Sequence, residues 1–207
     1  NGEIITTPGT TVSEGDKVTL DGRTVSTQRY YYFMLNKPRG YLSSNKDPHH
    51  TRFARDLIDH PQKDLLFHVG RLDINSTGLM IFTNDGAFAH MLQHPSFEVE
   101  KEYYVSVTGK IQEKDLKRAL KGVLFPDGIV YKLKRYVMLS DREAHVVLTE
   151  GKNREIRNLF SSFGCTIDIL HRVRIGPLEI GDLPPGGFRE IEGDVVASVV
   201  EGPCRKG

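Results

Sequence analysis

Short apolar runs that stop at turn residues constrain the fold of this chain more than any other feature of its sequence. Residues 30–36 (YYYFMLN) stop at Lys37-Pro38-Arg39-Gly40, and residues 78–83 (GLMIFT) stop at Asn84-Asp85-Gly86. Apolar runs of this length between turn residues are typical of buried strands. Patterns of the same kind predict further strands at residues 103–108, 132–139, 144–149 and 166–174, and a short last strand after the turn at 183–187.

The segments between these strands have a pattern typical of helices. It predicts helices at residues 51–58, 87–93, 112–121 and 153–163, the last two ending at Gly122 and Gly164. The helices and strands do not alternate as regular β-α-β units. We therefore predict an α+β domain built on a mixed, largely antiparallel sheet with flanking helices.

Residues 1–27 differ from the rest of the chain. They have short β-type runs at 3–5 and 17–20, separated by Pro8-Gly9, Glu14-Gly15 and Asp21-Gly22, and too few apolar residues to fold alone. We predict two domains, 1–27 as part of a small module and 28–207 as the main domain, with a linker at 26–29. Because the chain starts at Asn1 and not at Met, we expect sequence to precede it.

Composition restricts the function classes. The net charge is only +1 and there are two cysteines without a CxxC pair, which argues against a zinc ribbon and a disulfide framework. No apolar run approaches the length of a membrane span and no secretory signal is apparent, so we expect a cytoplasmic protein without a membrane partner. Locally, residues 29–46 carry Arg29, Lys37, Arg39 and Lys46 and no acid. Such a stretch is usually a solvated face, but it also suits phosphate binding.

Two possible sites lack the residues that their chemistry needs. His90 and His94 stand four apart in the run HMLQH, but a zinc protease needs Glu directly after the first His, and no third ligand is apparent. Gly186-Gly187 lacks the lysine and hydroxyl of a phosphate-binding loop. We therefore predict no metal site.

Residues 70–86 (GRLDINSTGLMIFTNDG) hold the most informative carboxylate. Asp73 lies just before an apolar strand, and Leu72, Leu79 and Ile81 predict a wall near it that excludes water. Taken alone, an aspartate in a loop is most often a cap or turn residue. A desolvated carboxylate, however, needs a cation or hydrogen bonds, so we expect a cation from another segment.

Five ordered motifs over residues 29–192 resemble the RsuA/RluB-type family of ribosomal RNA pseudouridine synthases, which includes the RluE and RluF types. The central motif is Gly70-Arg71-Leu72-Asp73 with Thr77-Gly78-Leu79 and Thr83-Asn84-Asp85-Gly86. The others are Asn36-Lys37-Pro38-Arg39-Gly40, Lys101-Glu102-Tyr103, the run from Glu150 to Arg157, and His171-Arg172-Val173-Arg174-Ile175-Gly176 with Leu183-Pro184-Pro185-Gly186. Residues 1–25 resemble the second half of the alpha-L RNA-binding module that usually precedes this catalytic domain.

The resemblance implies roles for the matching residues. Asp73 corresponds to the nucleophile, which attacks the uracil ring or the ribose anomeric carbon before the base is detached, rotated and rejoined through carbon. Arg157 corresponds to the basic partner of that aspartate, and its planar fork can hold both carboxylate oxygens. Tyr103 corresponds to the tyrosine that stacks on the target base and assists proton removal from carbon five. Ile156 corresponds to a pocket-wall residue, and Arg71 to a residue that holds the flipped nucleotide or the space it leaves.

The same motifs imply RNA contacts and a partner. The expected RNA-contacting residues are Lys37, Arg39, Lys152, Asn153 and Arg154, beside Arg71 and Ile156. The implied partner is ribosomal RNA or a ribosomal subunit precursor, bound by a monomer. The implied reaction is an isomerisation without a redox step, for which a carboxylate, an aromatic ring and a cation suffice, so we expect no cofactor. Whether the target lies in the small or the large subunit stays open, although residues 32–41 are slightly closer to the RsuA type.

Two other classes of protein fit less well. A non-catalytic RNA-binding or assembly factor with the same fold would not need the intact set of Asp73, Tyr103 and Arg157. A zinc-dependent nucleobase deaminase needs an HxE…PCxxC pattern, which the chain lacks.

Overall fold

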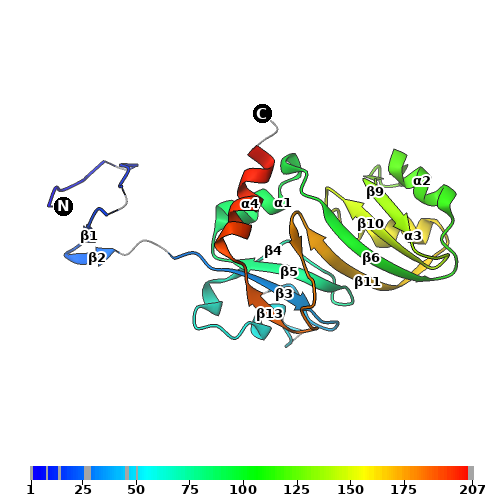
Figure 1. Ribbon diagram of the computed structural model, residues 1–207, viewed down its shortest axis with the longest axis horizontal. Helices are drawn as coiled ribbons and strands as arrows, with labels where there is room; N and C mark the ends of the chain where they lie inside the picture. The colour runs from blue at the N-terminus through cyan, green and yellow to red at the C-terminus, as the bar shows by residue number, and fades with distance from the viewer. Residues whose placement is uncertain are drawn as a thin grey trace. The chain divides into compact units, whose positions relative to one another are not determined.

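A computed structural model of the chain describes residues 2–7, 9–13, 15–25, 29–44, 47–49 and 51–204. The chain divides into two compact units, Asn1–Tyr30 and Tyr31–Gly207 (Figure 1). Most of the predicted linker at 26–29, and Lys46 of the basic stretch, lie outside the described residues.

The first unit contains one small hairpin. Strands β1 (Val18–Leu20) and β2 (Arg23–Val25) pair antiparallel around Asp21-Gly22, both of which have positive φ. The described residues of this unit form no strand at 3–5, contrary to the prediction. Ile4, Ile5 and Leu20 are exposed, because so short a segment has no core in which to bury them.

The second unit is built on a nine-stranded sheet in the order β13-β3-β5-β11-β6-β10-β9, with β12 beside β11 and β4 beside β5. All paired strands are antiparallel except β5 and β11, which are parallel. The predicted mixed, largely antiparallel sheet is therefore confirmed. Its strands are β3 (Tyr32–Lys37), β4 (Phe67–Val69), β5 (Thr77–Thr83), β6 (Lys101–Thr108), β9 (Arg135–Met138), β10 (Glu143–Leu148), β11 (Thr166–Ile175), β12 (Leu178–Glu179) and β13 (Phe188–Glu190).

The helices and minor elements connect these strands. The α-helices are α1 (Gly86–Gln93), α2 (Glu113–Lys121), α3 (Glu155–Ser162) and α4 (Gly193–Cys204); the 3-10 helices are Ala54–Leu57, Lys63–Leu65 and Pro95–Phe97; β7 (Val123–Leu124) and β8 (Val130–Tyr131) form a separate pair. The helix predicted at 51–58 is only the 3-10 turn Ala54–Leu57. Helix α4 was not predicted, because it is rich in valine, a residue with β preference.

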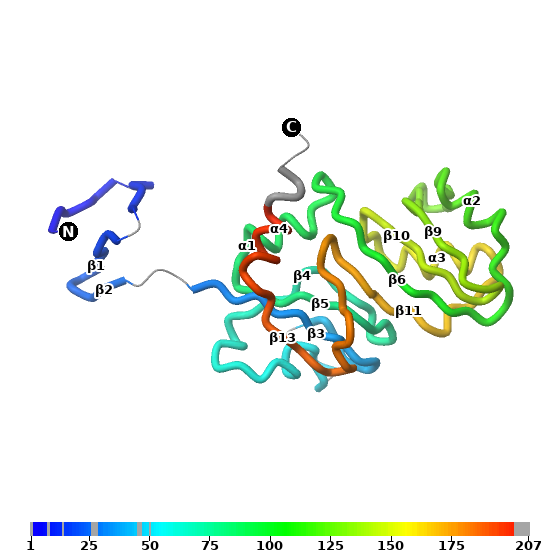
Figure 2. Tube along the Cα trace, in the orientation of Figure 1, coloured from blue at the N-terminus to red at the C-terminus, as the bar shows by residue number. Residues whose placement is uncertain are grey.

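Side chains on the two faces of the sheet belong to two hydrophobic cores. Met80 and Phe82 of β5 pack in the core that contains buried residues of α2 and α3, while Leu79 and Ile81 pack with α1 and with Val199 of α4. Figure 2 follows the backbone through these strands and helices. Burial on both faces explains why the run at 78–83 lacks the alternation of a half-exposed strand.

The pairing of β3 with β5 brings Lys37 opposite Gly78, where the loop 70–76 enters β5. The loop lies between β4 and β5 and carries Asp73. Among the described residues, no helix is long and apolar enough to cross a membrane.

Candidate active site

Lys37 fixes the loop that carries Asp73. Its side chain is fully buried. The ammonium donates to the main-chain carbonyls of Pro38 at 3.2 Å, Asp73 at 3.2 Å, Ile74 at 3.4 Å and Ser76 at 2.8 Å. Burial lowers the pKa of Lys37 to about 8, although the nearby Asp73 carboxylate acts in the opposite direction. One buried cation thus gathers the carbonyls that line the turn around Asp73.

Further hydrogen bonds hold the loop before and after Asp73. The Ser43 hydroxyl donates to the Leu72 carbonyl at 2.8 Å and accepts from the Leu72 amide at 3.0 Å. The Gly40 amide donates to the Ile74 carbonyl at 2.8 Å. Backbone fixed on both sides of a residue leaves its side chain few orientations, so the Asp73 carboxylate is presented in a defined direction.

Two arginines contact the Asp73 carboxylate at the same oxygen. Arg157 Nε and Arg154 Nη1 each lie 3.3 Å from Oδ2. The Arg157 Nη2 group donates instead to the Ser76 hydroxyl at 3.2 Å. The expected ion pair of Asp73 with Arg157 is therefore present, but the fork does not hold both oxygens. No described residue donates a hydrogen bond to the other oxygen, Oδ1.

The start of helix α3 positions both arginines. Arg154 precedes the helix in the left-handed region, with φ of 50°, a conformation that is strained for a residue other than glycine. The buried Glu155 carboxylate accepts from the backbone amides of Lys132 at 3.2 Å and Lys152 at 3.1 Å. Burial raises the pKa of Glu155 above its ordinary value. These bonds tie the first turn of α3 to neighbouring backbone.

A pocket of about 90 Å³ lies beside the Asp73 carboxylate. Most of the residues expected from the sequence line it: Asp73, Tyr103 and Arg157 as well as Arg71, Lys152, Arg154 and Ile156. Leu72, Leu148 and Leu170 supply the apolar wall. The Asp73 side chain is nevertheless 36% exposed, so the wall shields it less than the sequence led us to expect.

Three of the expected RNA contacts do not line this pocket. The Arg39 Nε group donates to the Asn75 side chain at 3.2 Å, and Asn153 is exposed. Lys37 has no exposed surface, and its ammonium is engaged with carbonyls. This burial speaks against the expected contact of Lys37 with RNA, since a fully covered group cannot meet a phosphate.

Tyr103 lies deep in the pocket wall, with 8% of its surface exposed. In the pairing of β6 with β11 it stands opposite Arg172. Arg172 Nη1 donates to the Tyr103 hydroxyl at 3.4 Å, and the guanidinium carbon lies 5.9 Å from the ring centroid. Sequence reasoning gave no role to Arg172, because nothing in the sequence alone shows which strand lies opposite Tyr103. It also missed that Arg154 pairs with Asp73 and that Ser76 holds Arg157.

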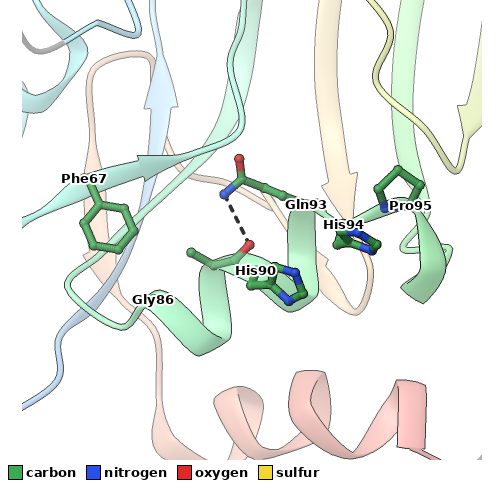
Figure 3. Close-up of a pocket in the computed structure, with 7 residues that line it drawn as sticks. Phe67, Gly86, His90, Gln93, His94 and Pro95 are labelled. Atoms are coloured by element: carbon green, nitrogen blue, oxygen red, sulfur yellow. Dashed lines mark hydrogen bonds between the residues drawn. The ribbon is translucent and has the colours of Figure 1, made fainter.

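A larger and shallower hollow of about 480 Å³ lies on helix α1 and its flanks, lined by Phe67, Gly86, Ala89, His90, Gln93, His94 and Pro95 (Figure 3). The Gln93 amide donates to the Ala89 carbonyl at 3.2 Å, and the rings of His90 and His94 lie with centroids 4.8 Å apart and planes tilted by 31°. No carboxylate belongs to its lining. Within the described ranges, no group of three or more His, Cys, Asp or Glu side chains is arranged to hold a metal ion. The pocket at Asp73 is therefore the candidate active site.

Comparison with known proteins gives concordant results. The family model described as RNA pseudouridylate synthase matches residues 31–162. A solved structure titled "Crystal structure of pseudouridylate synthase" superposes with a TM-score of 0.77 at 27% identity, covering 96% of this chain and 86% of that one.

Curated relatives agree with this match. An uncharacterized RNA pseudouridine synthase of Borreliella burgdorferi is 36% identical, over 89% of this chain and 78% of its own. A protein of Bacillus subtilis named ribosomal large subunit pseudouridine synthase B is 32% identical, over 92% of this chain and 80% of its own. A protein of Pseudomonas aeruginosa with the same name is 35% identical over 89% of this chain, which corresponds to only 50% of that relative.

Proposed function

Because this chain belongs to the RNA pseudouridylate synthase family, we propose that it isomerises a uridine of large-subunit ribosomal RNA, with Asp73 as the nucleophile. The observation that carries the proposal is the Asp73 carboxylate, held through one oxygen by Arg154 and Arg157 in a pocket that also contains Tyr103.

The two oxygens of Asp73 have different surroundings, which suits a nucleophile. The arginine pair orients the carboxylate through Oδ2 and favours its ionised form. Oδ1 accepts no hydrogen bond from the described residues, so its lone pairs are available to an electrophile. Carboxylates form covalent intermediates with sugars, and attack on the ribose anomeric carbon would expel the uracil. Attack on the uracil ring is the alternative route.

In either route the bond between the ribose anomeric carbon and the uracil nitrogen breaks, and the ribose carbon is rejoined to carbon five of the base. A proton then leaves carbon five and a proton is gained at the former glycosidic nitrogen, so the net reaction is an isomerisation and requires no redox step. Tyr103 is the aromatic residue of the pocket and is proposed to stack on the uracil, with Ile156 as another residue of the pocket wall. The target must leave the RNA stack to reach them.

The rim of the pocket is suited to RNA. Arg71 and Arg154 are exposed and line the pocket, and Lys152 lies beside them. Cationic side chains at a pocket rim attract phosphates and make affinity depend on salt. Arg71 forms no ion pair or hydrogen bond with another described side chain, which leaves its guanidinium available to the flipped nucleotide. Lys152 is less available, since it pairs with Glu150 at 2.8 Å.

The names of the relatives support the large subunit as the target. The proteins of Bacillus subtilis and Pseudomonas aeruginosa are named as synthases of that subunit. This outweighs the slight similarity of residues 32–41 to the RsuA type. Residues 1–27 are proposed as part of an RNA-binding module that contributes affinity and not chemistry, and the protein is proposed to act as a monomer in the cytoplasm.

The test is to map pseudouridine in ribosomal RNA from cells with and without the gene. We expect one site in large-subunit RNA to disappear and to return when the wild-type gene is supplied, but not when the Asp73→Asn gene is supplied. A site lost from small-subunit RNA would refute the target, and restoration by Asp73→Asn would refute the nucleophile.

A further inference from the structure

Arg172 is a buried cation without a carboxylate partner. It is only 2% exposed, and within the described ranges no acidic side chain forms an ion pair with it. Its Nε group donates to the Leu79 carbonyl at 2.7 Å and Nη1 to the Tyr103 hydroxyl, while Nη2 has no partner among the described residues. Burying a charge without an opposite charge is costly, so a buried guanidinium of this kind calls for an explanation.

Two lysines lie close enough to Arg172 for its charge to affect their pKa. Arg172 contributes to lowering the pKa of Lys37 and of Lys101, after burial in both cases and for Lys37 after the opposing effect of Asp73. Among the described residues, the Tyr103 phenol is therefore the one acidic group that the Arg172 guanidinium contacts. Negative charge on the phenolic oxygen would supply what this cation lacks.

The position of Arg172 is fixed by its neighbours on both strands. β11 pairs with β6 at Tyr103 and with β5 at Gly78. Gly78 has φ of +103°, and a Cβ atom there would lie 2.3 Å from the Arg172 carbonyl oxygen. Only glycine permits this approach, which holds the Arg172 backbone against β5 while its side chain reaches Tyr103. Arg172 does not line the pocket, so it acts through Tyr103 and does not contact RNA.

We propose that Arg172 is a positioning residue that holds the Tyr103 phenolic oxygen in place and stabilises the negative charge that develops on it while it removes the proton from carbon five of the bound uracil. This inference rests on the proposed function. Once carbon five has joined the ribose, the phenolic oxygen takes the proton from that carbon while its own proton passes to water. The electron pair of the carbon–hydrogen bond restores the double bond of the ring.

The test separates proton removal from the earlier steps. Single-turnover rates would be measured on RNA carrying uridine, uridine with deuterium at carbon five, or 5-fluorouridine, which has no proton at that carbon. The variants are Arg172→Met and Arg172→Lys. Arg174→Met is the matched control. It also removes a guanidinium from β11, but the Arg174 guanidinium pairs with Glu100 and Glu102 and not with Tyr103.

We expect Arg172→Met to slow pseudouridine formation about 100-fold, within the range of a lost contribution to proton transfer. Arg172→Lys should recover part of that loss. Both variants should show a larger deuterium isotope effect than the wild type, while consumption of 5-fluorouridine stays at the wild-type rate. Arg174→Met should leave the isotope effect unchanged, whatever its effect on the rates.

Other outcomes separate this inference from the proposed function. Equal slowing on all three substrates, without a larger isotope effect, would overturn the role of Arg172 and leave the proposed function intact. A wild-type protein inactive on large-subunit RNA would overturn the proposed function and this inference with it. If Arg172→Met does not fold, as judged by circular dichroism, the deuterium isotope effect of Arg172→Lys tests the inference in its place.

Discussion

Arg157 Nε lies 3.3 Å from an oxygen of the Asp73 carboxylate, across 84 positions of sequence. The same oxygen accepts from Arg154, whose side chain is 54% exposed, whereas that of Arg157 is 15% exposed. Because water screens the exposed pair more strongly, Arg157 should contribute most to orienting the carboxylate.

This difference between the two arginines gives the first prediction. Arg157→Ala should lower kcat about 100-fold, which corresponds to about 2.7 kcal/mol in the activation barrier. Arg157→Lys should lower kcat less than Arg157→Ala does, because an ammonium keeps the positive charge. It should still lower kcat, because an ammonium cannot contact Asp73 and Ser76 together as the guanidinium does. Arg154→Ala is the matched comparison and should lower kcat only a few-fold. Equal effects of the two alanine variants on kcat, measured on one RNA fragment, would contradict the assignment.

Lys37 gives a prediction about stability and pH. Its pKa in the folded chain is about 8, below the ordinary value of 10.5. Between about pH 8 and 10.5 the unfolded chain binds more protons than the folded chain, so the Lys37 contribution to the free energy of unfolding rises with pH there and is constant below. Lys37→Met should lack this rise. It should also be less stable at pH 7, because it leaves buried carbonyls without a donor.

Urea unfolding of both proteins at intervals from pH 7 to 10 measures this difference. Other groups titrate alike in the two proteins, so subtracting one curve from the other isolates Lys37. A difference that does not change with pH would refute the lowered pKa of Lys37.

Gly78 gives a prediction about the packing of β5 against β11. Gly78→Ala should destabilise the protein by about 3 kcal/mol, because the new methyl group meets the Arg172 backbone and because φ of +103° is unfavourable for alanine. Gly86→Ala is the control, since no atom lies within 4 Å of its would-be Cβ and its φ is not positive. A change in thermal unfolding of similar size for the two variants would contradict the close approach.

Arg71 and Lys152 should differ in their contributions to RNA affinity. Arg71→Ala should weaken binding and reduce the slope of log K against log salt by roughly 0.7–0.9, as expected for one lost phosphate contact. Lys152→Ala should change the slope less, because Lys152 already pairs with Glu150 and donates to the Val130 carbonyl at 2.8 Å. Dissociation constants over a salt series decide this, and the reverse order of the two slopes would refute it.

Much of the fold follows from local sequence patterns. The apolar run at 78–83 became β5, and Asp85 caps helix α1 by accepting from the amides of Ala87 and Phe88, as the Asn84-Asp85-Gly86 turn suggests. Helix α4 could not be predicted in this way. Its valines prefer strands locally, and the helix packs through Val195, Val196 and Val199 against a core that only the folded sheet creates.

The candidate site was predictable only in part. Ordered motifs identified Asp73, Tyr103 and Arg157, and the structure brings them to one pocket. Lysine side chains are rarely buried, so no local pattern suggested that Lys37 lies beneath the Asp73 loop. The contact of Arg172 with Tyr103 depends on the pairing of β11 with β6, which joins residues that are far apart in the chain. Long-range pairing of this kind leaves no signal in either segment alone.

The central claim is that Asp73 is the nucleophile, and the most direct measurement is the turnover of purified Asp73→Asn protein on a large-subunit RNA fragment that the wild type converts. The substitution keeps the shape of the side chain but removes its nucleophilic charge. We expect pseudouridine formation to fall by at least about 10,000-fold, while the dissociation constant for the RNA changes little. Pseudouridine formed by Asp73→Asn at a rate near that of the wild type would contradict the account.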